Sequence, residues 1–337
     1  MRRSSYDLRT TNRGSDMNDQ DHPAPDAEPR TRVGVVGLGA MGLGMARSLR
    51  AAGFSVGVHD LRPEVAADFA RDGGTAFASP ADLAAHVDVL VGVVVNAAQV
   101  ESVLFGDGEG GGAAARLRPG AVYVMCSTVD PAFSAGLEGR LAESGVHYLD
   151  APISGGAARA ASGELTMMTS GSPEAYALAG PVLDAMSATV YRLGDHAGLG
   201  SKVKIVNQLL AGVHIAAAAE AMALGIKAGV PADALYEVIT HSAGNSWMFE
   251  NRMAHVLAGD YTPLSAVDIF VKDLGLVLDS ARSETFPLPL SATAHQMFLQ
   301  ASASGLGRED DSAVIKIFPG IELPGAKTGR PGPAEEN

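Results

Sequence analysis

The stretch Gly37-Leu38-Gly39-Ala40-Met41-Gly42 decides the fold of the N-terminal half of this 337-residue chain. It follows a short valine-rich run at residues 33–36 and opens a helical pattern that extends to Ala52. Three glycines at this spacing, between a strand and a helix, are typical of a turn that holds a dinucleotide pyrophosphate. Gly37 permits the tight turn, Gly39 lets the backbone approach the ligand, and Gly42 lets helix and strand pack closely. The motif predicts a nicotinamide dinucleotide cofactor.

Asp60 ends the second predicted strand, about twenty residues beyond this turn. An acid at this place binds both ribose hydroxyls and repels the additional phosphate of NADP, so the sequence favours NAD. Arg62 follows two residues later and is suited to a 2′-phosphate, which weakens the preference. The alternative interpretation of Asp60 is a cap for the helix that begins near Pro63.

Strand and helix patterns alternate as far as Asp195, and only helical patterns follow. Alternation of this kind predicts an α/β domain with a doubly wound, mostly parallel sheet. We expect a Rossmann-type NAD-binding domain at residues 31–195 and an all-helical substrate or oligomerisation domain at residues 196–324. Residues 1–30 and 325–337 are polar and lack periodicity, which predicts flexible ends, and Met17 is an alternative translation start.

The composition excludes several classes of protein. Lys and Arg number 25 against 38 Asp and Glu, a net charge of −13 that argues against a nucleic-acid partner. The single cysteine, Cys126, rules out an internal disulfide framework and fits a reducing compartment, so we expect a cytoplasmic protein. The nine histidines show no ligand-spaced pair, and we predict no metal site. The most apolar stretch carries His214 and Glu220, so we predict no membrane span.

A second motif, Asp150-Ala151-Pro152-Ile153-Ser154-Gly155-Gly156, follows a predicted strand. The Ser154 hydroxyl and the backbone amides of Gly155 and Gly156 are suited to a substrate carboxylate. Taken alone, the segment is as easily an ordinary turn.

A third motif, Gly198-Leu199-Gly200-Ser201-Lys202-Val203-Lys204, leads into a long helical pattern for which Ser201 is the expected cap. Lys204, Asn207 and Gln208 stand at i, i+3 and i+4 and therefore share one helix face. Burial near a helix N-terminus would lower the pKa of Lys204 from about 10.4 toward the range of a general acid–base. On spacing alone, Lys204 reads as a surface lysine.

These three motifs, in this order and spacing, resemble the β-hydroxyacid dehydrogenases, the family of 3-hydroxyisobutyrate dehydrogenase and 6-phosphogluconate dehydrogenase. The resemblance runs from Val33 to Lys316. It implies that Lys204 is the catalytic acid–base and that Ser154, Gly155 and Gly156 hold the substrate carboxylate. It also implies that cofactor is bound by residues beyond the glycine-rich turn, namely Asp60, Asn96, Thr128 and Lys272. Where many members of the family have Leu-Pro-Asn, this chain has Val94-Val95-Asn96. Where many have Asn-Asn after the lysine, it has Asn207-Gln208, which leaves open which of these two side-chain amides contacts substrate.

The implied activity is NAD-dependent oxidation of a small hydroxyacid, in an enzyme that is a homodimer or homotetramer. The helical half resembles a subgroup whose substrate is a four-carbon sugar acid, through segments 204–214, 241–252, 265–273 and 309–316. His241, Ser242 and Asn245 are suited to additional substrate hydroxyls, or else they end a helix near Gly244. Two alternatives remain: a reductase of tartronate or succinic semialdehyde or another 3-hydroxyacid dehydrogenase, and an idle NAD-binding sensor.

Overall fold

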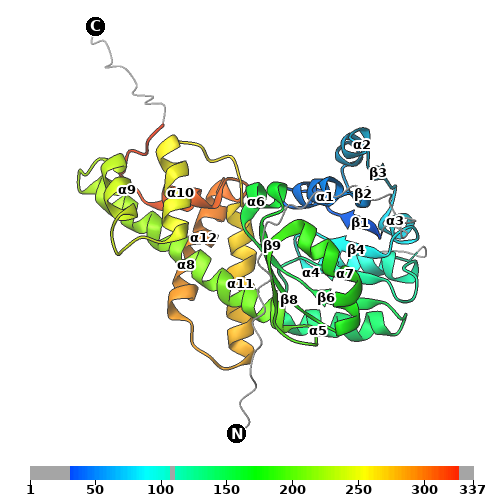
Figure 1. The fold of residues 1–337 in the computed structure, drawn as a ribbon. Helices are drawn as coiled ribbons and strands as arrows, with labels where there is room; N and C mark the ends of the chain where they lie inside the picture. Colours follow the sequence, from blue (N-terminus) through cyan, green and yellow to red (C-terminus); the bar gives the residue numbers. More distant parts are fainter. Residues whose placement is uncertain (1–30, 107–110, 326–337) are drawn as a thin grey trace, which may run out of the picture. The chain divides into compact units, whose positions relative to one another are not determined.

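The computed structural model describes residues 31–106 and 111–325, so the predicted flexible ends and the alternative start at Met17 lie outside it. The chain divides into two compact units, the first ending at Ile205 and the second beginning at Val206. Figure 1 shows the sheet-containing first unit and the helices of the second. The division falls ten residues beyond the boundary drawn from the sequence.

The first unit is built on one sheet whose described strands run in the order β3-β2-β1-β4-β5-β6-β8-β7, with β9 beside β8. The strands are β1 (Arg32–Val36), β2 (Ser55–His59), β3 (Thr75–Ala76), β4 (Val89–Gly92), β5 (Val122–Met125), β6 (His147–Asp150), β7 (Ile153–Ser154), β8 (Leu165–Gly171) and β9 (Ser187–Arg192). All pairings from β3 through β6 are parallel, whereas β8 runs antiparallel to β6 and β7. The order reverses between β1 and β4, which is where such sheets bind nucleotides.

Successive side chains on the central strands point alternately into two hydrophobic cores, one on each face of the sheet. Val89 and Val91 of β4 join one core, while Leu90 between them joins the other. The helices are α1 (Gly42–Ala51), α2 (Pro63–Arg71), α3 (Pro80–Ala84), α4 (Ala97–Phe105), α5 (Pro131–Ala142), α6 (Gly156–Ser162) and α7 (Pro173–Met186). Residues of α1, α2, α6 and α7 lie in the first core, and those of α3, α4 and α5 in the second. The sheet is therefore covered on both faces, as a doubly wound fold requires.

The described residues of the second unit form helices joined by loops, with no β-strand among them. Helix α8 (Leu199–Lys227) continues into it from the first unit, and α9 (Ala232–Thr240), α10 (Trp247–Ala258), α11 (Val267–Ser283) and α12 (Pro289–Ala301) follow. Phe270 of α11 stacks on Phe298 of α12, with ring centroids 5.2 Å apart. The predicted α/β fold with a C-terminal helical region is thus confirmed.

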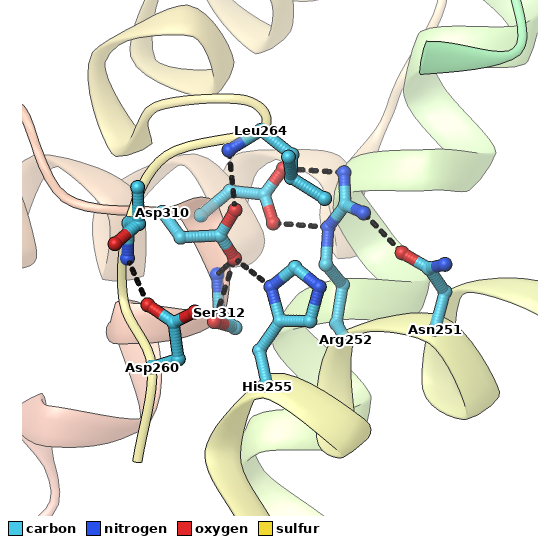
Figure 2. A network of polar contacts seen from close by, with 9 residues as sticks. Asn251, Arg252, His255, Asp260, Leu264, Asp310 and Ser312 are labelled. Atoms are coloured by element: carbon cyan, nitrogen blue, oxygen red, sulfur yellow. Dashed lines mark hydrogen bonds and ion pairs between the residues drawn. The ribbon is translucent and has the colours of Figure 1, made fainter. Parts of the chain in front are cut away.

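A buried network of ion pairs and hydrogen bonds lies in the second unit (Figure 2). Arg252 of α10 donates from Nε and Nη2 to the two carboxylate oxygens of Asp311, at 2.5 and 3.0 Å. The neighbouring Asp310 accepts from His255 Nδ1 at 3.2 Å and from the backbone amide of Leu264 at 3.0 Å. Both carboxylates are fully buried, so these contacts tie the C-terminal segment to α10.

Several elements differ from their predicted form. Helix α8 begins at Leu199, so Ser201 lies inside its first turn and is not its cap. Helical patterns in the sequence also predict helices at residues 290–304 and 311–318. In the structure, α12 ends at Ala301 before a π turn, and Asp311–Ile317 is a 3₁₀ helix. Of the described helices, α8 is long and apolar enough to cross a membrane by length and composition, a test that buried helices of globular proteins also pass.

Candidate active site

The glycine-rich turn lies between β1 and α1 at the carboxyl edge of the sheet. Gly37 has φ +93°, and a Cβ there would lie 2.4 Å from the carbonyl oxygen of Val93. A Cβ on Gly42 would meet the Gly37 carbonyl oxygen, so the helix start packs directly on the turn. Around Gly39, in contrast, no atom lies within 4 Å of a would-be Cβ. The turn is therefore closed at its two ends and open at its middle, which fits a pyrophosphate above the N-terminus of α1.

Asp60, immediately after β2, is joined to this turn. Its Oδ2 accepts from the backbone amide of Leu38 at 2.6 Å, and its Oδ1 accepts from the amide and Nε of Arg62 at 2.9 and 3.0 Å. Burial works against ionisation, but these donors outweigh it, and the pKa of Asp60 lies below its ordinary value. Asp60 is thus a carboxylate held beside the glycine-rich turn, and the Arg62 guanidinium is held against it.

Asn96 and Thr128 follow the next two strands of the sheet. Asn96 is the N-cap of α4, where its Oδ1 accepts from the amide of Gln99 at 2.9 Å. Thr128 lies half-buried in the turn after β5. The two turns are linked, because the Ser127 hydroxyl donates to the carbonyl oxygen of Val94 at 2.7 Å. The structure therefore brings the predicted cofactor residues of the first unit to one edge of the sheet.

The predicted carboxylate-binding turn and Lys204 are adjacent. Lys204 is 7% exposed, and its Nζ donates to the carbonyl oxygen of Ile153 at 2.8 Å. Ile153 directly precedes Ser154, which ends β7. Gly155 and Gly156 have φ of +136° and +76°, backbone conformations that residues other than glycine rarely adopt. Lys204 is not the surface lysine that its spacing alone suggested; it is buried beside the Ser-Gly-Gly turn.

Asn207 and Gln208 lie on the following turn of α8. Asn207 Nδ2 donates to Gln208 Oε1 at 3.0 Å, and Gln208 Nε2 donates to Asp273 Oδ2 at 2.5 Å. The other oxygen of Asp273 pairs with Lys272 Nζ at 2.7 Å. In the second unit, therefore, one buried carboxylate orders both Gln208 and the predicted cofactor lysine.

The sequence interpretation overlooked Asp150 and Ser170. Asp150, at the end of β6, accepts from the amides of Gly198 and Ser201 at 2.9 and 2.8 Å and from the Ser201 hydroxyl at 2.7 Å. Ser170 of β8 accepts from the amide of Gly200 at 3.0 Å. The Asp-Ala-Pro turn quoted above was the available signal, but its partners lie far along the chain.

His241, Ser242 and Asn245 make local contacts that end α9. The Ser242 hydroxyl donates to the carbonyl of Val238 at 2.6 Å, and Asn245 Nδ2 donates to that of Thr240 at 3.1 Å. His241 Nδ1 lies 2.8 Å from the Glu237 carbonyl oxygen. These contacts favour the role in helix termination over substrate recognition.

Comparison with known proteins finds relatives that cover both units of the chain. Residues 32–194 match the family model of the NAD-binding domain of 6-phosphogluconate dehydrogenase, and residues 198–318 match that of the NAD-binding domain of NADP-dependent 3-hydroxyisobutyrate dehydrogenase. An L-threonate dehydrogenase of Cupriavidus necator is 67% identical over 293 residues, which cover 87% of this chain and 98% of the relative. The chain belongs to the 3-hydroxyisobutyrate dehydrogenase-like family of β-hydroxyacid dehydrogenases.

Two further members of this β-hydroxyacid dehydrogenase family cover nearly the same part of the chain. An L-threonate dehydrogenase of Escherichia coli is 54% identical over 88% of this chain and 97% of its own length. A crystal structure described as 3-hydroxyisobutyrate dehydrogenase from Salmonella typhimurium is 55% identical and superposes with a TM-score of 0.81, covering 86% of this chain and all of that one. The predicted family and an NAD-dependent hydroxyacid dehydrogenase activity are confirmed.

Proposed function

We propose that the protein oxidises L-threonate to 2-dehydro-L-erythronate with NAD, through Lys204 as general acid–base. The observation that carries the proposal is the hydrogen bond from Lys204 Nζ to Ile153, one residue before the turn suited to a carboxylate. The L-threonate dehydrogenases at 54–67% identity over most of the chain support the substrate. A hydroxyacid bound by its carboxylate at this turn would place a hydroxyl near the lysine.

The residues of the first unit fit a bound NAD. The open middle of the glycine-rich turn leaves room for the pyrophosphate, and the Asp60 carboxylate suits the ribose hydroxyls. Asn96 Oδ1 accepts from the amide of Gln99 as the cap of α4, so its side-chain nitrogen Nδ2 is the atom that would donate to the nicotinamide ribose. Thr128 and Lys272 are proposed as further cofactor ligands on the basis of the family pattern. NAD, when bound, supplies the hydride acceptor.

The chain's own residues then perform three tasks. Ser154 and the amides of Gly155 and Gly156 bind the substrate carboxylate and fix the orientation of the carbon to be oxidised. Lys204 removes the proton from the reacting hydroxyl, and its ammonium then stabilises the developing carbonyl oxygen. Asn207 or Gln208, one turn further along α8, orients that hydroxyl.

Replacement of the lysine tests this mechanism. General acid–base catalysis supplies about 10² to 10⁴-fold, so Lys204→Ala is expected to lose at least about 10²-fold in turnover while it still binds NAD. Lys202→Ala is the matched control, because Lys202 is exposed and two positions away. Near-normal turnover of Lys204→Ala would overturn the assignment of the lysine.

A substrate panel tests the reaction itself. NADH formation is measured with L-threonate, D-threonate, D-glycerate and 3-hydroxyisobutyrate, and reduction is measured with tartronate and succinic semialdehydes. We expect L-threonate to give by far the highest kcat/KM. A preference for another acid would refute the substrate and leave the mechanism to be tested on that acid.

We also propose that the enzyme is a cytoplasmic homodimer or homotetramer without nucleic-acid or membrane partners. Light scattering tests the oligomeric state, and cell fractionation tests the localisation.

A further inference from the structure

The start of α8 is held by side chains that lie on two strands of the sheet. Asp150 Oδ2 accepts from the amides of Gly198 and Ser201, and the Ser170 hydroxyl accepts from the amide of Gly200. Ser170 in turn donates to Asp150 Oδ2 at 3.3 Å. Asp150 and Ser170 are both fully buried. Three backbone amides around the helix start, those of Gly198, Gly200 and Ser201, are thereby satisfied within the protein core.

This arrangement is more rigid than an ordinary cap. A usual N-cap residue precedes its helix in sequence and moves with it. Here the acceptors belong to β6 and β8, which pair with each other through Asp150 and Ser170. The first turn of α8 is therefore fixed to the sheet, and a charged acceptor makes these hydrogen bonds stronger than neutral ones.

The same segment also holds the tip of the lysine. Three residues beyond Asp150, the carbonyl oxygen of Ile153 accepts from Lys204 Nζ. Lys204 lies three residues beyond Ser201, which is about one helical turn. Residues 150–153 thus restrain Lys204 at both ends, through the backbone of its helix and through its ammonium group.

We propose that Asp150 and Ser170 are positioning residues for the reaction, which hold Lys204 at the Ser154-Gly155-Gly156 turn. Neither residue contacts the substrate in this scheme, which rests on the proposed catalytic role of Lys204. A lysine displaced by about 1 Å loses its alignment with the reacting hydroxyl, at a cost of roughly 10²-fold in rate. Loss of this anchor is therefore expected to lower kcat and to leave NAD affinity unchanged.

Two serines, two residues apart, separate this role from simple stabilisation. Ser170→Ala removes the acceptor for the amide of Gly200 in α8. Ser172→Ala removes the acceptor for the amide of Ala175 in α7, a helix that carries no predicted site residue. Both variants lose one hydroxyl at one helix start. Asp150→Asn is a third variant, which keeps the size of the side chain and one acceptor oxygen but loses the charge.

Three measurements are made on the full-length variants: Tm, the Kd for NAD, and kcat on the acid that the wild type oxidises fastest. We expect Ser170→Ala and Asp150→Asn to lose roughly ten- to a hundredfold in kcat at unchanged NAD affinity. Ser172→Ala is expected to lower Tm through loss of the α7 cap and to keep its kcat. Equal effects of the two serine variants on kcat, or none from either, would overturn the positioning role.

A fourth measurement does not depend on activity. The rate at which acetic anhydride modifies Lys204, followed by peptide mass spectrometry, is expected to rise in Ser170→Ala and not in Ser172→Ala. If the wild type oxidised none of the acids tested, the proposed function would fail, and this labelling would still show whether Asp150 and Ser170 hold Lys204 in place. Equal labelling of Lys204 in the two variants would count against it.

Discussion

Gly200→Ala is the substitution that most directly tests how the site is built. A Cβ at this position would lie 2.4 Å from the carbonyl oxygen of Met168 and 3.0 Å from that of Asp150. Both neighbours are backbone atoms of sheet strands, so they give way less readily than a flexible side chain. A carbon–oxygen contact below 3.0 Å is essentially never seen, so the first turn of α8 must move by at least about 0.6 Å.

That movement reaches Lys204, which is four residues further along the same helix. A misplacement of about 1 Å costs roughly 10²-fold in rate, so Gly200→Ala is expected to lose roughly ten- to a hundredfold in kcat. The affinity for NAD should be unchanged, because the glycine-rich turn, Asp60 and Asn96 belong to other elements of the sheet edge. Turnover is followed by NADH absorbance, and NAD binding by titration calorimetry.

Gly136→Ala is the matched control. Gly136 lies in the middle of α5, where no atom is within 4 Å of the added Cβ. Alanine is favoured over glycine inside a helix by about 0.5–1 kcal/mol, so this variant should be slightly more stable than the wild type, with unchanged kcat. A Gly200→Ala enzyme with kcat within twofold of the wild type would refute the argument that the helix start positions the lysine.

Two more substitutions test the cofactor site and the second unit. Asp60→Ala removes the acceptor for ribose hydroxyls and releases Arg62, so the NAD/NADP ratio of kcat/KM is expected to fall by roughly ten- to a hundredfold. Arg62→Ala in the same background should reverse the gain with NADP, and an unchanged ratio in Asp60→Ala would exclude Asp60 as the ribose acid. In the second unit, burial raises the pKa of Asp311 to about 6, although Arg252 opposes the rise. Because the folded-state pKa exceeds the unfolded one, this contribution to stability is complete below about pH 4 and is lost as pH rises through about 6. Between pH 5 and 7 the free energy of unfolding should therefore fall by about 1 kcal/mol more in the wild type than in Asp311→Asn. Urea titration monitored by the single tryptophan, Trp247 of α10, measures this, and parallel pH profiles would contradict it.

The fold could be predicted because its signals are local. In the turn at residues 37–42, Gly37 has φ +93°, and a Cβ on Gly42 would meet the Gly37 carbonyl oxygen, so both requirements for glycine arise within the motif. The valine-rich composition of the central strands likewise predicts that they are buried on both faces. The short strands β3 and β7, two residues each, carry no periodicity, and only their partners define them.

The start of α8 could not be predicted, because its cap comes from far along the chain. A local reading places the cap at Ser201, the nearest residue with a suitable side chain. The structure instead uses Asp150, 51 residues away, and Gly198 with φ +103° lets the chain turn into the helix earlier. Burial of Lys204 follows from the same long-range contact, so spacing alone favoured an exposed lysine.

The choice of aspartate at position 150 also bears on the lysine. Burial raises the pKa of Asp150, and the donors from Ser201 and Gly198 only partly offset this effect. Asparagine would fill the same space without the cost of a buried charge, but it has one acceptor oxygen where Asp150 uses two, Oδ2 for the backbone amides and Oδ1 for the Ser201 hydroxyl. The carboxylate, unlike the amide, places a negative charge at the positive end of the α8 dipole, one turn before Lys204. A negative charge there reduces the repulsion between the helix N-terminus and the ammonium, so an aspartate serves the anchored lysine in a way that an amide does not.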